Sequence, residues 1–321
     1  MTKRVAAIDC GTNSLRLLIA DIDVAGRQLS DVERRMEIVR LGQGVDATGR
    51  LAPEALERTL RALADYAADI RAAGATAIRM VATSATRDAS NAADFSSGVQ
   101  RTLGIAPEVI TGREEARLSF AGATAELAGT AGSAVRPEPP YLVVDIGGGS
   151  TEFVLGGNEA VTGADPTAIS VDIGCVRLTE RYLHADPPTR EQVDAATADI
   201  DRVLADVAAS VPVKEACTLV GVAGSVTTVT AIALGLPTYD PSRTHHARVS
   251  AETVATVTEL LLGQTHEQRA AIGALHPGRI DVIGAGALVL NRIMRRFGFT
   301  EMVASEHDIL DGIAWSIAAD A

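Results

Sequence analysis

One pattern occurs twice in this chain, and it limits the possible folds more than any other feature. Residues 8–14 read IDCGTNS and residues 144–150 read VDIGGGS, so both copies follow the scheme apolar-Asp-x-Gly-x-x-Ser. Each copy follows a short apolar strand and leads into a second one, Leu15–Ala20 or Thr151–Leu155, which predicts a β-hairpin with a polar turn. The two aspartates lie 136 residues apart, about one domain length. We therefore expect two related domains that face each other, each giving one loop to a shared cleft.

The residue types of the repeated loop suit a phosphate that is carried with a metal ion. A carboxylate such as Asp9 or Asp145 suits Mg²⁺, a hard cation that prefers oxygen ligands and keeps several waters. Glycines let successive N–H groups point toward an anion, and serines add hydroxyl donors. In a packed element, each glycine of 147–149 would cost about 0.5–1 kcal/mol. A turn stabilised only by its Asp would explain either copy alone, but it would not require the duplication.

The rest of the chain alternates strands with helices, which predicts an α/β fold in two lobes. In the first half we expect an amphipathic helix over Pro53–Ala73, a strand over Ile78–Ala82 and a polar turn over Thr83–Asp88, with Asn91 capping the next helix. A further helix is expected from Gly112 to about Leu127. In the second half, strands are expected near 141–146, 151–156, 168–173 and 218–223, and helices near 190–209, 251–263 and 277–297.

Composition supports this class of fold and argues against several functions. Of the 321 residues, 47% are hydrophobic and only 3% are aromatic, so the core must be aliphatic and rich in alanine. The net charge of −12 argues against a nucleic-acid-binding surface, which needs a basic face. A polyanionic substrate would likewise need a local basic strip or bound cations to offset this field.

Cysteines and apolar stretches indicate a cytoplasmic protein without a membrane segment. Cys10, Cys175 and Cys217 lack metal-ligand spacing, and we interpret them as small buried residues in a reducing compartment. The beginning of the chain does not resemble a signal peptide. The uncharged stretch Ala216–Tyr239 is long enough to cross a bilayer, but its Gly, Ser and Thr content fits a strand, a loop and a buried helix better.

Three further segments carry candidate catalytic or anion-binding residues. Glu114 and Glu115 open a helix just after a strand, where a carboxylate favours the helix dipole but could also activate a water as general base. Arg87 could pair with a phosphate or be solvated at the surface. The segment GVAGSVTT forms a strand end and a helix start, where Gly224 and Ser225 could hold an anion.

The histidines are interpreted as structural. His245 and His246 resemble a metal pair, but adjacent residues on a strand would point to opposite faces. The other histidines have no ligand-like spacing, and no zinc motif, Walker A loop or nucleophile elbow occurs.

These motifs together resemble one protein family. AAIDCGTNSLRLLIAD, VATSATRDASN, ITGREEARLSFAGA, VVDIGGGSTEF and GVAGSVTT are similar, in this order, to segments of the exopolyphosphatase / guanosine pentaphosphate phosphohydrolase family, within the actin-like ATPase superfamily. The resemblance covers nearly the whole chain. It implies an α/β fold with two ribonuclease-H-like lobes around a central cleft. Because the Gly- and Pro-rich stretch Gly129–Pro140 is typical of a linker, we place the lobe boundary there, with lobes at 1–130 and 131–304. The resemblance further implies that a final helix, 305–321, returns to the first lobe.

The resemblance also implies site residues and a cofactor. Glu115 matches the family's catalytic base, Glu114 its neighbour and Glu152 a second active-site glutamate. Asp9 and Asp145 match the aspartates beside Mg²⁺ and the phosphates. The phosphate-binding candidates are Gly11, Thr12, Asn13, Ser14, Arg87, Gly147, Gly148, Gly149, Ser150, Gly224 and Ser225.

The resulting hypothesis is Mg²⁺-dependent hydrolysis of the terminal phosphate of inorganic polyphosphate, with Glu115 taking a proton from the attacking water. Hydrolysis of guanosine pentaphosphate (pppGpp) would use the same chemistry and stays open, as do a sugar or acid kinase of the same superfamily and a non-catalytic nucleotide-sensing protein. The chain stops after the two-lobe core, whereas longer family members carry a C-terminal helical domain, which favours short polyphosphate chains here. It also has Leu310-Asp311-Gly312 where the family often has Arg-Glu-Gly. The resemblance points to a homodimer.

Overall fold

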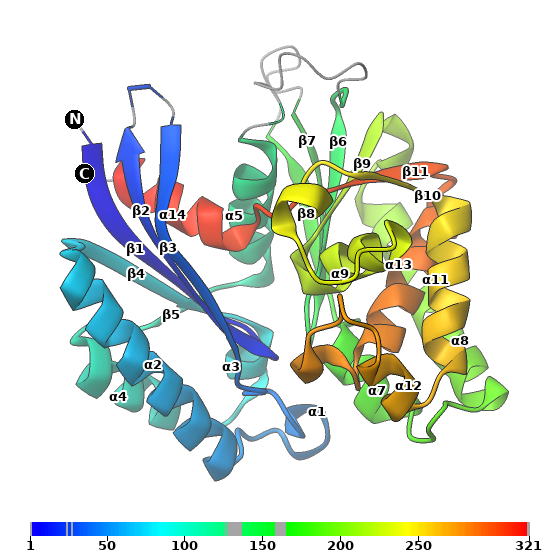
Figure 1. Ribbon diagram of the computed structural model, residues 1–321, viewed down its shortest axis with the longest axis horizontal. Coiled ribbons are helices and arrows are strands. Elements are labelled where there is room, and N and C mark those ends of the chain that lie inside the picture. The colour runs from blue at the N-terminus through cyan, green and yellow to red at the C-terminus, as the bar shows by residue number, and fades with distance from the viewer. Residues whose placement is uncertain are drawn as a thin grey trace. The chain divides into compact units, whose positions relative to one another are not determined.

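The computed structural model describes residues 2–23, 25–26, 28–125, 127, 137–157 and 165–319 (Figure 1). Its contacts divide the chain into two compact units: Met1–Gly122 together with Ile309–Ala321, and Ala123–Asp308. The predicted linker Gly129–Pro140 and the predicted boundary after residue 130 lie mostly outside the described residues.

The first unit contains a five-stranded sheet in the order β3-β2-β1-β4-β5. Strands β1 (Thr2–Cys10), β2 (Ser14–Asp23) and β3 (Gln28–Ile38) form an antiparallel meander. Strands β4 (Ala77–Ala82) and β5 (Glu108–Val109) continue the sheet parallel to β1. The carboxyl ends of three parallel strands therefore share one edge of this sheet.

The second unit repeats this arrangement and adds one edge strand. Its sheet has the order β10-β11-β9-β6-β7-β8. Strands β6 (Tyr141–Ile146), β7 (Thr151–Gly156) and β8 (Thr167–Val171) form the meander, and β9 (Thr218–Val222) and β11 (Glu301–Ala304) run parallel to β6. The added strand, β10 (Arg248–Ser250), pairs antiparallel with β11. Read from β8 to β11, the order matches that of the first sheet, so the duplication seen in two loops extends to the strand order of both units.

Helices cover both faces of the first sheet (Figure 1). Alternate residues of β1, including Ala6 and Ile8, pack in one core with α2 (Pro53–Ala73) and α4 (Ala92–Leu103). The intervening residues, including Val5 and Ala7, pack in another core with α5 (Gly112–Thr124) and α14 (Ile309–Ala319). Because side chains alternate along a strand, Asp9 lies on the face covered by α5 and α14. Two short helices complete this unit: α1 (Val45–Thr48) and α3 (Ser84–Asp88).

In the second unit, one large core lies on a single face of the sheet. Leu142, Val144 and Ile146 of β6 and Phe153 of β7 belong to it, together with buried residues from the unit's longer helices. Asp145 lies on the opposite face because it alternates with these residues. In its described residues, the helices of this unit are α7 (Cys175–Tyr182), α8 (Arg190–Ser210), α9 (Ala223–Ala233), α10 (Pro241–Thr244), α11 (Ala251–Gly263), α12 (His266–Ala270) and α13 (Ile283–Phe297), with 3₁₀ turns at Val213–Glu215 and Pro277–Arg279.

Several predicted elements are confirmed, and a few differ for identifiable reasons. Helix α2 begins at Pro53 and ends before Gly74, whose φ of 71° suits a glycine C-cap. The predicted turn at 83–88 is instead the short helix α3. Asn91 occupies the N-cap position of α4, but its side chain does not cap the helix: it accepts from the amide of Leu51 and donates to the carbonyl of the same residue.

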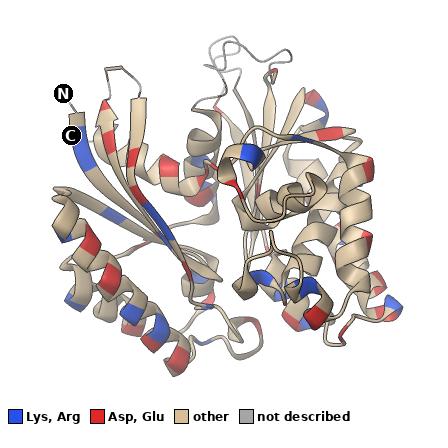
Figure 2. Cartoon of the chain, in the orientation of Figure 1, with Lys and Arg blue, Asp and Glu red and all other residues tan. Residues whose placement is uncertain are grey.

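Neither a one-sided charge distribution (Figure 2) nor a long apolar helix is found in the described part of the chain. Basic and acidic residues are interleaved over the elements of both units rather than gathered in one strip (Figure 2). None of the helices in the described ranges has both the length and the apolar character needed to cross a bilayer.

Candidate functional site

Three loops meet at the carboxyl edge of the first sheet. The register places Cys10 beside Ala82, and Ala82 beside Val109, so β1, β4 and β5 end together. The amide of Thr83 donates to the carbonyl of Cys10 (3.2 Å), and the amide of Ile110 donates to that of Ala82 (3.1 Å). This edge therefore brings together the loop of the first repeated motif, the segment that contains Arg87 and the start of the helix that carries the two glutamates.

Asp9 is buried and forms an ion pair across its hairpin. It lies directly opposite Arg16 in the β1–β2 register and is 4% exposed. The Arg16 guanidinium donates to Oδ2 of Asp9 from Nη2 (2.7 Å) and Nε (3.0 Å). The β1–β2 hairpin thus places the positive charge of Arg16 beside Asp9. The sequence immediately around Asp9 did not indicate this ion pair.

The loop that follows Asp9 contains a buried side-chain amide, that of Asn13, which is suited to bind a ligand. The amide of Gly11 donates to the carbonyl of Ser14 (3.0 Å), which closes the turn, and the hydroxyl of Thr12 shares a hydrogen bond with that of Ser84 (2.8 Å). Asn13 is only 6% exposed, yet neither its Oδ1 nor its Nδ2 has a hydrogen-bond partner among the described residues. A buried polar group without a partner is costly unless a ligand or water satisfies it, so this side chain is suited to bind one.

Glu115 and Glu114 have different surroundings although they are adjacent. Glu115 is 8% exposed, and its Oε2 accepts a hydrogen bond from Nη1 of Arg87 (2.8 Å). Glu114 has a side chain that is 40% exposed and lies 3.6 Å from Arg79. Arg87 also donates to the carbonyl of Ile110 (3.0 Å), which holds its guanidinium at the sheet edge. Glu115 is therefore the ordered, buried carboxylate of the pair.

In the second unit, two carboxylates occupy neighbouring positions. Asp145 and Glu152 are directly opposite in the β6–β7 register, so their side chains lie on the same face of the sheet. Both are buried, at 6% and 1% exposure, and the hydroxyl of Ser170 donates to Oε1 of Glu152 (2.7 Å). The equivalent position in the first hairpin holds Arg16, so one copy of the motif places a cation beside its aspartate and the other places a second acid.

The start of helix α7 supports the glycine loop at 147–150 through hydrogen bonds to the carbonyl groups of the loop. The amides of Cys175 and Val176 donate to the carbonyls of Gly147 (3.0 Å) and Gly148 (2.9 Å), and Nε of Arg177 donates to the carbonyl of Gly149 (2.7 Å). Gly174 packs so closely on the loop that an added Cβ would lie 2.4 Å from the Gly148 carbonyl oxygen. Because these carbonyls bond to α7 and Arg177, they are turned away from the opposite side of the loop, which leaves that side to N–H groups.

The third predicted anion loop contains a residue that the sequence did not reveal. An added Cβ at Gly224 would lie 1.9 Å from Cζ of Arg279, so the Arg279 guanidinium packs directly on this glycine. Burial raises the pKa of the Cys175 thiol, and the positive charge of Arg279 offsets part of the rise, so this arginine also lies near the start of α7. Ser225 is 3% exposed and lies against Gly286. No local pattern distinguishes Arg279, because it lies 55 residues beyond Gly224 in a Pro-Gly-Arg turn.

Two expectations about single residues are wrong. His245 and His246 were expected to point to opposite faces, but their ring centroids lie 3.7 Å apart and the rings stack. They follow a short helix rather than lying on a strand, and His246 has a φ of 60°. Cys217 was expected to be buried but is exposed. Within the described residues, no group of three or more His, Cys, Asp or Glu side chains is arranged to hold a metal ion by itself.

Comparisons with known proteins agree with the features described above. The pattern of the Ppx/GppA phosphatase family matches residues 18–320. Exopolyphosphatase 2 of Mycobacterium tuberculosis is 51% identical over 326 residues, which cover 98% of both chains. The crystal structure of an exopolyphosphatase-like protein superposes with a TM-score of 0.92 at 43% identity and covers 99% of each chain. The Aquifex aeolicus PPX-GPPA enzyme superposes with a TM-score of 0.79 at 32% identity, over 98% of this chain and 100% of that one. The predicted actin-like ATPase fold is thereby confirmed.

Proposed function

Because this chain belongs to the Ppx/GppA phosphatase family, we propose that it is an exopolyphosphatase, a hydrolase that removes the terminal phosphate of inorganic polyphosphate. The observation that carries this proposal is the buried Glu115–Arg87 pair, which lies at the same sheet edge as Asn13, whose side chain has no hydrogen-bond partner among the described residues. A carboxylate beside a group suited to bind an anion is the arrangement that water-dependent cleavage of a phosphoanhydride requires.

Glu115 is the proposed general base. Its burial and its hydrogen bond from Arg87 hold it in one orientation, so a carboxylate is fixed at the sheet edge where it could accept a proton from water. The transition state of phosphoryl transfer is loose, so positioning and charge neutralisation contribute more than covalent chemistry. Asn13 and Thr12 in the first unit and the glycine loop at 147–150 in the second are the proposed phosphate-binding groups.

Asp145 and Glu152 fit a divalent cation. Two buried carboxylates on one face of a sheet repel each other, and an oxygen-preferring ion such as Mg²⁺ would offset this while keeping most of its waters. One or two carboxylates with phosphate oxygens are the usual protein ligands of Mg²⁺, so a site of this size agrees with the absence of a three-residue cluster in the described ranges. Asp9 is less suited to bind the ion directly because Arg16 already neutralises it. When bound, the ion would withdraw charge from the oxygens of the phosphoryl group.

Local arginines offset the acidic character of the chain. Arg87, Arg16 and Arg279 each lie against a proposed site residue: Glu115, Asp9 and Gly224. These positive charges reduce the field of a protein whose net charge is −12 at the places where an anion would bind.

The direct test is Glu115→Gln. We expect kcat for short polyphosphate to fall by about 10²–10⁴-fold, the usual contribution of a general base, with KM nearly unchanged. Glu114→Gln should cost less than about tenfold because that side chain is half-exposed and pairs with Arg79. Glu108→Gln, on an exposed glutamate that pairs with the same arginine, is the matched control. A Glu115→Gln enzyme that keeps most of its turnover would remove this residue from the mechanism.

A substrate panel separates polyphosphate from its nearest alternative. Phosphate release from tripolyphosphate, long-chain polyphosphate, pppGpp and ATP should be compared with and without Mg²⁺. We propose that short polyphosphate is the best substrate and that turnover requires the ion. A higher kcat/KM for pppGpp than for any polyphosphate would instead identify the nucleotide as the main substrate.

A further inference from the structure

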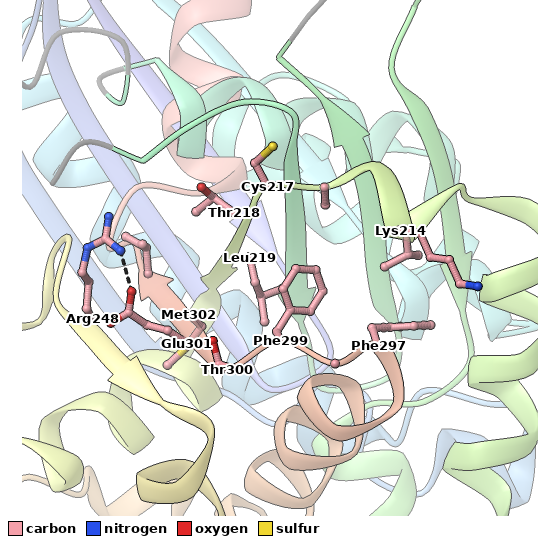
Figure 3. A pocket seen from close by; sticks show the side chains of 14 residues that line it. Lys214, Cys217, Thr218, Leu219, Arg248, Phe297, Phe299, Thr300, Glu301 and Met302 are labelled. Carbon is pink, nitrogen blue, oxygen red and sulfur yellow. Dashed lines mark hydrogen bonds and ion pairs between the residues drawn. The ribbon is translucent and has the colours of Figure 1, made fainter.

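A separate pocket of about 330 Å³ lies in the second unit, at the amino ends of strands β9 and β11 (Figure 3). The proposed anion loops of this unit lie at the opposite, carboxyl ends of the same strands. The length of β9, from Thr218 to Val222, places about 13 Å between the two ends. A molecule in this pocket would therefore occupy a site of its own.

The pocket opens because two neighbouring strands diverge. Strands β9 and β11 pair only between Val220 and Val303 and between Gly221 and Ala304. The first residues of β9 pair on the other side with β6, and those of β11 pair with β10, but they do not pair with each other. The gap thus exposes the inner edges of two strands, whose backbone polar groups can bind a ligand.

Aromatic and charged side chains line the gap. In the view of Figure 3, Phe299 is drawn between Lys214 on one side and the ion pair of Arg248 with Glu301 on the other. The ring of Phe297 is held edge-to-face by Phe153 with centroids 6.4 Å apart. Leu219 and Met302 add apolar surface. One wall is therefore suited to a flat ring, and the guanidinium–carboxylate pair offers both donors and an acceptor.

Lys214 adds a positively charged group to the lining of the pocket. It is exposed, and it forms no ion pair with any residue that the structure describes. Lys214 is one of only two lysines among the 29 basic residues of the chain. By contrast, Arg87 at the proposed active site and Arg248 in this pocket each form an ion pair with a glutamate. An ammonium at the mouth of a pocket is suited to a phosphate or carboxylate group.

We propose that this pocket binds a nucleoside monophosphate, with its base against Phe299, the base edge at the Arg248–Glu301 pair and the phosphate at Lys214. The volume lies within the range of small-molecule sites, and it suits one nucleotide rather than a polymer. The proposal does not depend on the hydrolytic activity, because it concerns the other end of the sheet.

Cys217 on the rim allows a direct measurement. It is exposed and lines the pocket, whereas Cys10 and Cys175 are buried, so a maleimide should modify Cys217 alone in the native protein. If only the free form reacts, AMP at ten times its Kd should slow this modification about tenfold. The Kd of adenosine, which lacks the phosphate, should be at least about threefold higher than that of AMP when both are measured by protection of Cys217. Ribose 5-phosphate, which lacks the base, should not protect Cys217.

Variants of the lining complete the test. Lys214→Met should weaken protection by AMP about three- to tenfold and leave protection by adenosine unchanged, since only the contact with the phosphate is lost. Lys3→Met, on the only other lysine, is the matched control. Phe299→Leu should weaken both ligands; if it does not fold, the exposed Lys214 variant still decides the question. No protection by about 10 mM AMP, equal protection by ribose 5-phosphate, or unchanged AMP binding in Lys214→Met would each overturn the proposal.

Discussion

Two helices of the first unit cross in backbone contact at Gly312. This glycine lies in the first turn of α14, and an added Cβ there would lie 1.9 Å from the carbonyl oxygen of Leu118 in α5 and 2.7 Å from its carbonyl carbon. Contacts under 3.0 Å essentially do not occur for a real Cβ, so Gly312→Ala must move the two helices apart by about 1 Å or more. The obstacle is main chain, which cannot rotate away as a side chain can.

The cost can be estimated from two opposing terms. Overpacking of a filled core costs about 1–3 kcal/mol, and a rigid backbone neighbour favours the upper part of that range. The higher helix propensity of alanine than of glycine stabilises the folded state by about 1 kcal/mol. The expected net loss is about 1–2 kcal/mol. For a unit of this size that corresponds to a fall in Tm of about 3–10 °C.

The matched control is Gly263→Ala at the end of α11. That glycine has no neighbouring atom within 4 Å of an added Cβ, so the same chemical change meets open space. Its Tm should stay the same or rise slightly. Both variants should be compared with the parent by calorimetry. If Gly312→Ala is as stable as Gly263→Ala, the two helices do not cross in backbone contact and the reasoning fails.

The same substitution has a consequence for catalysis. Leu118 lies one helical turn after Glu115 in α5, so a displacement at the crossing is transmitted to the proposed base. A misplacement of about 1 Å can cost on the order of 10²-fold in rate. We expect kcat of Gly312→Ala to fall well below that of Gly263→Ala at a temperature where both are folded. Equal kcat values would show that α5 does not set the position of Glu115.

Three further predictions concern other contacts. Gly174→Ala should lower kcat/KM by at least about tenfold, because its Cβ would lie 2.4 Å from the Gly148 carbonyl oxygen and would displace the glycine loop; an unchanged value would contradict the close approach. Asp311→Asn should lower Tm, because Asp311 is 2% exposed and breaking its ion pair with the partly exposed Arg34 costs about 1–3 kcal/mol; a Tm equal to that of the parent would refute this. Native protein at pH 8 should react with one equivalent of a thiol reagent and denatured protein with three, because only Cys217 is exposed and burial raises the pKa of the other two thiols; mass spectrometry counts the adducts.

The local elements of this protein follow from the sequence because their causes are local. Pro53 and Gly74 define the two ends of α2 within a short segment, and both repeated loops form hairpins because a strand, a polar turn and a second strand are contiguous. Two copies of one motif were enough to predict two similar α/β units. The candidate Asp, Gly and Glu residues could be named for the same reason.

The partners of those residues were decided only by the tertiary structure. Whether Glu114 or Glu115 is buried depends on where Arg87 and Arg79 lie, and these arginines come from helix α3 and strand β4, far from the glutamates in the sequence. Arg279 reaches Gly224 only after the chain has folded over 54 intervening residues. Propensities and periodicity describe how each segment pairs with its neighbours. Packing over a sheet edge, by contrast, depends on which distant side chains fill the remaining space, and that information is spread over the whole chain.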